Sequence, residues 1–229
     1  MTTPEEHLRR TPLRAALVNA GAAWATAGDC AVADRLGDAG SARHLAITDL
    51  SPLPRLGFKG RETIAAMQKR GLTVEATPNR AFRQDDGGLC LVLAPGEVIL
   101  LSPLAGDGGR MRELHDQWSL DSVERTYPLL RSDSHAWIVI SGAKAPEMFA
   151  KICAIDLSLD SFPDLSIAQT SVAKLSAIVT RADIGKTSAF HILADSASAL
   201  YLFDCLTDAA QEFGGSLACL DVLKNLEDG

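Results

Sequence analysis

Two halves of this chain repeat the same order of apolar runs and glycines. In the first half a short strand-like run ends at Gly60, a helical pattern follows, and a hairpin turns at Pro95-Gly96. In the second half a similar run ends at Gly142, and the later hairpin turn contains Gly185. The two strand-ending glycines are 82 residues apart, and the two hairpin glycines are 89 apart. Repeated supersecondary order of this kind indicates an internal duplication.

The repeated unit contains both strands and helices, so the predicted fold class is α+β, with antiparallel sheet on one side of each lobe and helices on the other. We expect residues 1–43 to form an N-terminal helix and loop that pack on the core. Residues 44–229 would then form one domain of two lobes, about 44–118 and 119–229. The alternative is a chance repeat, because a strand followed by glycine and a helix is common.

Hydrophobic spacing locates the individual elements. The predicted strands are 45–50, 56–59 and 137–141, the hairpin arms are 89–94 with 97–101 and 175–181 with 188–194, and the helices are 11–27, 61–70, 143–154 and 196–213. The last helix has the strongest pattern, because its apolar residues fall on one face and Gly214-Gly215 ends it. That face consists of Leu200, Phe203, Leu206, Ala210 and Phe213.

The composition is that of a folded chain without affinity for polyanions. Apolar residues make up 47% of the 229 residues, and the formal net charge of −7 opposes binding to nucleic acid or anionic lipid. Five cysteines without CxxC spacing favour a reducing, cytoplasmic compartment. Segment 1–10 does not have the apolar core of a signal peptide, and no apolar run approaches the ~20 residues that cross a bilayer. We therefore expect a cytoplasmic protein with no nucleic-acid or membrane partner.

The usual signatures of catalytic and cofactor sites are incomplete in this sequence. Gly185-Lys186-Thr187 resembles the end of a phosphate-binding loop, but Thr180 stands where that loop needs a glycine, and the segment lies in a predicted hairpin. No GxGxxG or GxSxG occurs, and no two of the five histidines have HxH or HxxxH spacing. The sequence therefore predicts no catalytic, cofactor-binding or metal-ligating residue.

Three polar features have both a chemical and a structural interpretation. His191 lies in a predicted strand, where a satisfied or solvent-facing histidine is more common than a metal ligand. Asp133 and His135 stand just before a strand and could form an acid/base pair, although no nucleophile accompanies them and a capped turn is the other interpretation. Asp85-Asp86 is typical of a solvated turn, and two adjacent carboxylates support a cation site only weakly.

Short motifs also connect the chain to a known pair of families. The first half contains Thr11-Pro12-Leu13, then residues 19–22 (NAGA), then Asp49-Leu50-Ser51 before the strand that leads to Gly60. This order resembles the opening of glycine-cleavage T-proteins. The second half contains 135–142 (HAWIVISG), 190–193 (FHIL) and 208–214 (DAAQEFG), which resemble the gamma subunits of heterotetrameric sarcosine oxidase. The order and spacing of these motifs over residues 44–215 carry the resemblance.

The resemblance implies duplicated α+β lobes like the folate-binding part of T-proteins, lacking that family's C-terminal barrel. It also implies a non-catalytic gamma-type subunit of a sarcosine oxidase-like flavoenzyme complex, a heterotetramer that oxidatively demethylates sarcosine or a related N-methyl amine. Its partners would be alpha-, beta- and delta-type subunits. FAD, FMN, NAD and tetrahydrofolate are then expected in the partner subunits, and no cofactor is expected in this chain.

One departure from the T-proteins bears on chemistry. T-proteins carry paired aspartates just after a Gly-Gly, and the first of them orients the folate and the transferred aminomethyl group. The matching stretch here is 87–92 (GGLCLV), which has the glycines but not the carboxylates, and Asp85 and Asp86 lie before the glycines. Apolar side chains cannot hydrogen-bond an amine or stabilise a developing cation. A second departure is Asp195, which follows the second hairpin where gamma subunits often have a basic residue.

Two other functions stay open. One is a stand-alone folate-dependent aminomethyl- or methyltransferase related to T-protein, against which the missing carboxylates argue. The other is an α+β scaffold or binding module unrelated to either family. If the chain is a subunit, part of its surface is apolar and permanently buried. The candidate surfaces are the predicted N-terminal helix, with Leu13, Leu17 and Trp24, and the apolar run 99–104, although both could be ordinary core.

Overall fold

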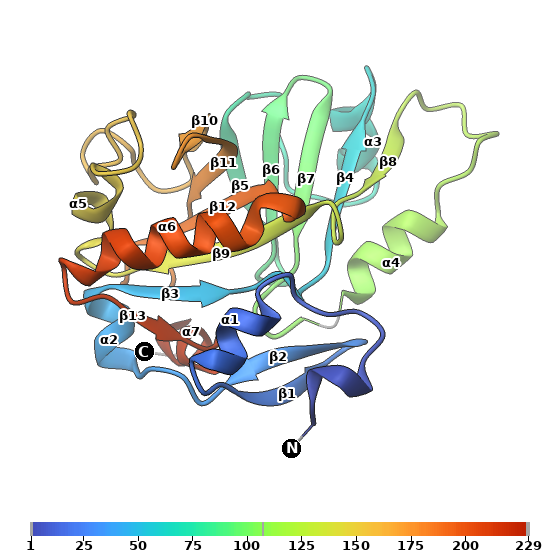
Figure 1. Ribbon diagram of the computed structural model, residues 1–229. Coiled ribbons are helices and arrows are strands. Elements are labelled where there is room, and N and C mark those ends of the chain that lie inside the picture. Colours follow the sequence, from blue (N-terminus) through green and yellow to red (C-terminus); the bar gives the residue numbers. More distant parts are fainter. Residues whose placement is uncertain (1, 107, 228–229) are drawn as a thin grey trace. The chain divides into compact units, whose positions relative to one another are not determined.

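The computed structural model describes residues 2–106 and 108–227 and contains helices and largely antiparallel sheets (Figure 1). The predicted α+β fold class is therefore confirmed. The chain forms two compact units. The residues up to Pro52 and those from Ser134 onward form one, called the N/C unit below, and Leu53–Asp133 form the other, called the middle unit.

The middle unit contains a five-stranded antiparallel sheet with the strand order β5-β6-β7-β4-β8. Its elements are Arg55–Lys59 (β4), Thr63–Lys69 (α3), Arg80–Arg83 (β5), Leu89–Ala94 (β6), Glu97–Leu101 (β7), Gly109–Asp116 (α4) and Tyr127–Leu130 (β8). Apolar side chains on one face of the sheet, such as Phe58, Val92 and Leu100, form a core with Met67 of α3 and Leu114 of α4. Both helices therefore cover the same face.

The N/C unit contains a six-stranded sheet with the order β10-β11-β12-β9-β3-β13, antiparallel except for the parallel pair β3 and β13. Its strands are Ala46–Asp49 (β3), His135–Ser141 (β9), Ile167–Val172 (β10), Leu175–Arg181 (β11), Ala189–Asp195 (β12) and Ser216–Ala218 (β13), and a separate hairpin joins Ala23–Ala27 (β1) to Cys30–Asp34 (β2). Its helices are Arg14–Asn19 (α1), Ala39–His44 (α2), Ala145–Phe149 (α5), Ala199–Gln211 (α6) and Leu220–Glu227 (α7), with 3₁₀ turns at Pro4–Glu6 and Ser196–Ser198. Helix α6 packs on one face of this sheet (Figure 1).

The two sheets have the same connectivity, which confirms the predicted duplication. In the middle unit the chain runs β4, α3, β5, β6, β7, and the strands are ordered β5-β6-β7-β4. In the N/C unit the chain runs β9, α5, β10, β11, β12, and the strands are ordered β10-β11-β12-β9. A further strand then pairs with the outer edge of β4 and of β9, namely β8 and β3.

The two strand-ending glycines are required by close backbone approach. Gly60 and Gly142 have φ values of 157° and 111°. A Cβ atom on Gly60 would collide with the carbonyl of Arg125, just before β8, and one on Gly142 would collide with the carbonyl of His44, just before β3. In both repeats, therefore, a glycine lies against the backbone that leads into the further strand, where a side chain would not fit.

The repeats and the compact units have different boundaries because the first strands are exchanged. Strand β3 precedes β4 in the chain but pairs with β9, and β8 precedes β9 but pairs with β4. Each repeat thus donates its first strand to the other repeat's sheet. The compact units consequently divide at 52–53 and 133–134, whereas the lobes expected from the sequence divide at 118–119.

Two of the predicted helices are shorter than expected. The predicted helix 11–27 is wrong in its second half, because Gly21 turns the chain with a φ of 80° and the following residues pair as strand β1. Thr11 is not the predicted cap, because α1 begins at Arg14 after Leu13, and the Thr11 hydroxyl instead accepts a hydrogen bond of 3.1 Å from the Leu13 N–H in the preceding turn. In place of a helix over 143–154, α5 ends at Phe149 and turns follow. In the alanine-rich segment Ala23–Ala27, pairing with β2 outweighs the propensity to form a helix.

Helix α6 confirms the predicted C-terminal helix, but its apolar face is rotated. Asp195 accepts a hydrogen bond of 2.8 Å from the Ala197 N–H, and a 3₁₀ turn precedes the α-helix. Leu200 consequently points outward and is 49% exposed. The buried residues of α6 are Ala199, Leu202, Phe203, Leu206, Ala209 and Ala210.

Both segments considered as partner-binding surfaces belong to the core. Leu13, Leu17 and Trp24 are at most 8% exposed. The isoleucine and leucines of 99–104 are at most 6% exposed, because most of this run forms strand β7 inside the sheet. The interpretation of these segments as interfaces is therefore wrong.

Candidate functional site

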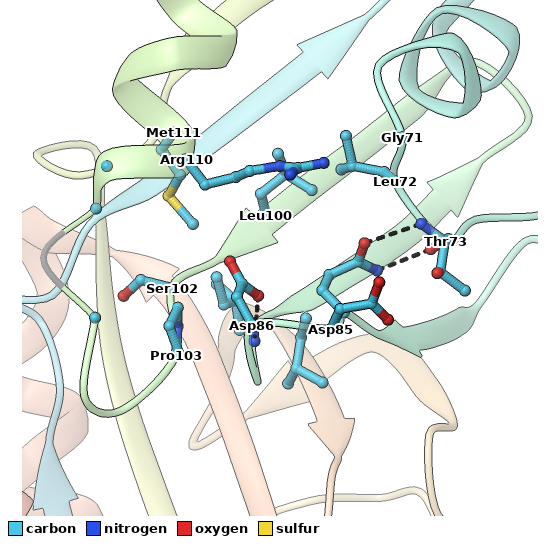
Figure 2. Close-up of a pocket in the computed structure, with 17 residues that line it drawn as sticks. Gly71, Leu72, Thr73, Asp85, Asp86, Leu100, Ser102, Pro103, Arg110 and Met111 are labelled. Carbon is cyan, nitrogen blue, oxygen red and sulfur yellow. Dashed lines mark hydrogen bonds between the residues drawn. The ribbon is translucent and has the colours of Figure 1, made fainter.

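A cavity of about 270 Å³ lies within the middle unit (Figure 2). Strands β6 and β7, the segment after α3 and the first turn of α4 surround it. Its apolar lining consists of Leu72, Leu89, Leu100, Leu101 and Met111, all of which are buried. The cavity is thus a hollow in the helix-covered end of the sheet.

Polar side chains from three segments line the same cavity. Asp85 and Asp86 come from the turn between β5 and β6, Ser102 follows β7, and Arg110 comes from the first turn of α4. In Figure 2 the Arg110 side chain extends from the helix across the cavity, on the opposite side from the two carboxylates. The cavity therefore has carboxylates on one side, a guanidinium on the other, and an apolar lining.

Hydrogen bonds to the backbone hold these segments in place. The Gln84 amide accepts from the Thr73 N–H at 3.0 Å and donates to the Thr73 carbonyl at 2.8 Å, which joins the β5–β6 turn to the segment after α3. One carboxylate oxygen of Asp86 accepts from the Gly88 N–H at 2.9 Å. The Arg110 guanidinium donates to the Arg70 carbonyl at 3.1 Å. The cavity is therefore preorganised by contacts within the unit.

The polar side chains of the cavity can bind charged groups of a ligand. Thr73 and Ser102 bring hydroxyl groups to its lining, and no histidine or cysteine lines it among the described residues. A serine nucleophile needs a positioned general base within hydrogen-bond reach. Asp85 and Asp86 can pair with a cationic group, and Arg110 can pair with an anionic one.

The stretch that matches the paired aspartates of T-proteins forms core. Cys90, Leu91 and Val92 lie in β6 and are fully buried, and Leu91 pairs with Ile99 of β7. Burial raises the pKa of the Cys90 thiol to about 12, so this thiol is protonated and unreactive at neutral pH. The side chains at these positions pack the sheet and have no polar group to offer a ligand.

Histidine 191 is satisfied within the core of the N/C unit. The Trp137 indole N–H donates to Nδ1 of His191 at 3.1 Å, and Nε2 lies 3.2 Å from the Ala182 carbonyl. These contacts require the neutral tautomer with the proton on Nε2. The two rings lie 5.8 Å apart. His191 therefore joins the central strands β9 and β12, and both of its ring nitrogens are used.

The other polar features of the sequence take structural positions. Gly185 lies in the turn between β11 and β12, where Ile184 and Thr187 pair, and a strand rather than a helix follows it. His135 begins β9 and bonds through Nδ1 to the Ser134 hydroxyl at 2.9 Å. His135 lies opposite Asp195 in the register of β9 and β12. None of these positions lines the cavity.

The T-protein-like motifs of the first half meet in one buried network. The Thr11 hydroxyl donates to one carboxylate oxygen of Asp49, whose other oxygen accepts from the Ser51 N–H at 2.9 Å. The Ser51 hydroxyl accepts from the Trp137 N–H at 3.0 Å, and the Leu50 N–H donates to the Trp137 carbonyl at 2.8 Å. These motifs thus tie the N-terminal segment to β9, which explains their residue types by structure rather than by chemistry.

No group of three or more His, Cys, Asp or Glu side chains within 2–106 and 108–227 is arranged to hold a metal ion. No helix in these ranges has both the length and the apolar character needed to span a bilayer.

Comparisons with known proteins identify the fold. No protein-family model matches the chain, and no curated protein matches it. Among solved structures, a chain of heterotetrameric sarcosine oxidase from Corynebacterium sp. U-96 in complex with pyrrole 2-carboxylate is similar with a TM-score of 0.67 and 19% identity, covering 90% of this chain and 97% of that chain. The glycine cleavage system aminomethyltransferase T from Bartonella henselae is similar with a TM-score of 0.73 and 13% identity, covering 96% of this chain and 62% of that chain.

These likenesses confirm the predicted resemblance at the level of the fold. The chain has the duplicated α+β fold that is shared with a sarcosine oxidase subunit and with T-protein. It matches nearly the whole length of the oxidase chain but less than two thirds of the T-protein chain.

The sequence did not indicate Ser102 or Arg110 as site residues. Both come from segments that are far from Asp86 in sequence, and only the fold brings them to one cavity. A signal that could have pointed to this region is the glycine-rich run that ends at Gly109, because glycines commonly mark close approach of a backbone to a ligand.

Proposed function

We propose that this chain is a non-catalytic, gamma-type subunit of a sarcosine oxidase-like flavoenzyme complex. The observation that carries the proposal is the fold match over 97% of an oxidase chain, together with apolar core at the positions of the T-protein aspartates. A transferase needs the carboxylate to stabilise charge on the reacting amine. A chain with that fold but with the apolar stretch 87–92 (GGLCLV) in place of the aspartate motif is suited to a structural role.

An exposed apolar surface supports a role in an assembly. Ten large apolar side chains are exposed among the described residues, and four of them lie between positions 120 and 130. These are Leu120 (83% exposed), Val123 (95%), Tyr127 and Leu130. Strand β8 is also the edge strand of the middle sheet. Leu120 and Val123 lie in the loop before β8, and Tyr127 and Leu130 point to opposite faces of this strand. Exposed apolar side chains on and beside an edge strand are typical of a protein–protein contact.

This surface segment is held in a defined conformation. The Trp118 indole donates to the Thr126 carbonyl at 2.8 Å and closes the loop. Glu124 forms ion pairs with Arg70 at 2.6 Å and with Lys69 at 3.0 Å. Hydrogen bonds from Arg70 and Lys69 lower the pKa of Glu124, so these pairs are complete above the ordinary value of 4.5 and are lost as the pH falls through the lowered value. At neutral pH the apolar side chains are presented by an ordered loop.

The proposed partners are alpha-, beta- and delta-type subunits of the same complex. FAD, FMN, NAD and tetrahydrofolate would bind to those partners, and the reaction would be oxidative demethylation of sarcosine or a related N-methyl amine. The five free cysteines, of which four are buried, fit the proposed cytoplasmic location. The acidic net charge of −7 fits a protein without a nucleic-acid partner.

The T-protein likeness favours one alternative, a folate-dependent aminomethyltransferase. Its TM-score of 0.73 over 96% of this chain is the observation in its favour. Calorimetric titration of the purified full chain with tetrahydrofolate separates the two functions. The subunit proposal predicts weak binding or none and no one-carbon transfer. Micromolar binding that is lost when residues beside Leu91 are replaced would support the transferase instead.

Co-expression with the proteins encoded beside it tests the subunit proposal itself. Amine oxidation by the purified complex is expected to continue when polar side chains of this chain, such as Asp86 or His135, are replaced one at a time. Loss of turnover with unchanged assembly in any of these variants would assign a catalytic role to the chain and contradict the proposal.

A further inference from the structure

We propose that the cavity of the middle unit binds a free amino acid with an apolar side chain. This inference does not depend on the subunit proposal, since it rests on the cavity alone. The volume of about 270 Å³ lies just below the ~300–1,000 Å³ of sites for drug-sized ligands. Its occupant is therefore a small metabolite.

The carboxylate side of the cavity suits an ammonium group. Asp85 and Asp86 line it together, and neither forms an ion pair with another side chain in the part of the chain that the structure describes. The Gly88 N–H fixes one oxygen of Asp86 at 2.9 Å and leaves the other free to accept. A carboxylate that is already oriented loses little entropy when a charged donor binds.

The opposite side suits a carboxylate group. Arg110 is held by its bond to the Arg70 carbonyl at 3.1 Å, and this contact uses one of its five N–H donors. Gly108 and Gly109, which also line the cavity, lie at the N-terminus of the eight-residue helix α4. The positive end of the helix dipole adds to the attraction of the Arg110 guanidinium for an anion.

The lining between these two sides determines the rest of the ligand. Leu72, Leu89, Leu100 and Met111 present apolar surface, which binds an aliphatic side chain by the hydrophobic effect. Ser102 is 4% exposed and its hydroxyl has no hydrogen-bond partner among the described residues. A buried hydroxyl without a partner is costly, so it favours a ligand with a polar group in reach.

Taken as a set, these groups match a zwitterion better than a simple cation or anion. A cation alone would leave Arg110 without a counterion, and an anion alone would lie near two carboxylates. Leucine and methionine have both charged groups and an apolar side chain of suitable size. We therefore use L-leucine and L-methionine as probes.

The test is calorimetric titration of the full chain, alone or in the complex with which it co-purifies. Leucine is expected to bind in a saturable manner. Glycine, 4-methylpentanoate and 3-methylbutylamine are each expected to bind at least about tenfold more weakly, because each lacks one of the three recognised groups. Binding of the acid or the amine as tightly as leucine would overturn the zwitterion assignment.

Charge-neutral variants locate the site. Asp86→Asn keeps an oxygen for the Gly88 N–H, and Arg110→Gln removes the guanidinium, so both are expected to weaken leucine binding at least about tenfold. Two matched controls lie on α4 at positions that do not line the cavity: Asp116→Asn removes a carboxylate, and Arg112→Gln removes a guanidinium. Both are expected to leave leucine binding unchanged. Circular dichroism checks that each variant is folded. No saturable binding of either amino acid up to about 10 mM, or binding that the cavity variants do not change, would refute the proposal.

Discussion

Replacing Gly142 with alanine tests the structural basis of the duplication. Gly142 ends β9 with a φ of 111°, a conformation that residues with a Cβ rarely adopt. The added Cβ would collide with the His44 carbonyl oxygen and would lie 2.5 Å from its carbonyl carbon and 2.8 Å from the Leu45 nitrogen. The same carbonyl accepts from the Lys144 N–H at 2.9 Å. The substitution therefore strains the turn and displaces the backbone that leads into β3.

The expected loss of stability is the sum of two terms. An unfavourable backbone conformation costs roughly 1–3 kcal/mol, and overpacking against fixed atoms costs roughly another 1–3 kcal/mol. We expect Gly142→Ala to reduce the free energy of unfolding by about 4 kcal/mol. Gly28→Ala is the matched control, because Gly28 has a φ of 59° with no atom within 4 Å of the added Cβ. That control should cost only about 1–2 kcal/mol.

Urea denaturation followed by circular dichroism measures both variants. The Gly142→Ala midpoint should fall well below that of Gly28→Ala with an unchanged m-value. Gly60→Ala should resemble Gly142→Ala, since the Arg125 backbone approaches it in the same way. Equal losses for Gly142→Ala and Gly28→Ala would refute the argument, because the cost would then come from the backbone conformation alone.

Two further predictions concern packing and thiol chemistry. Phe203→Ala should cost about 3–5 kcal/mol of stability, whereas Leu200→Ala, on the exposed face of the same helix, should change it by less than about 0.5 kcal/mol; equal shifts of the urea midpoint would contradict the packing of α6. With a thiol-alkylating reagent at mildly alkaline pH, Cys205 should react in the folded protein and Cys90 should react only after unfolding, because burial raises its pKa to about 12. Early labelling of Cys90 would mean that β6 is accessible to solvent.

Local sequence signals predicted the repeated part of the fold well. The hairpin arms of β6 and β7 have the bounds expected from their apolar runs and from the turn at Pro95-Gly96. Strand β4, the glycine after it and helix α3 also lie where their patterns placed them. In these elements, local propensity, apolar period and turn residues all favour the same structure.

The missed elements depend on contacts that are distant in sequence. Strand β8 contains Pro128 and forms only because it pairs with β4, and β13 has three residues that pair with β3. Strand β1 replaced a predicted helix for the same reason, because it pairs with β2. The exchange of β3 and β8 between the sheets leaves no local trace, so the unit boundaries could not be predicted from the order of the elements.

In the candidate site too, one feature could be predicted from local sequence and another depends on contacts that are distant in sequence. The absence of the T-proteins' paired aspartates from the stretch 87–92 could be seen in the sequence, and in the structure its residues Cys90, Leu91 and Val92 are completely buried in β6. The cavity could not be predicted, because Ser102, Arg110 and Asp86 meet only after the sheet and α4 have packed together. Each of these residues by itself is an ordinary polar residue near a turn or at the start of a helix.

Co-purification tests the subunit proposal most directly. A tagged chain is expressed with the proteins encoded beside it, and native mass spectrometry and flavin absorbance measure the composition of the purified assembly. The account predicts a fixed stoichiometry with a yellow flavoprotein that oxidises sarcosine or a related N-methyl amine. Val123→Asp should reduce this recovery without changing the melting temperature of the chain, because Val123 is 95% exposed. A soluble, monomeric chain that purifies without a flavoprotein would contradict the proposal.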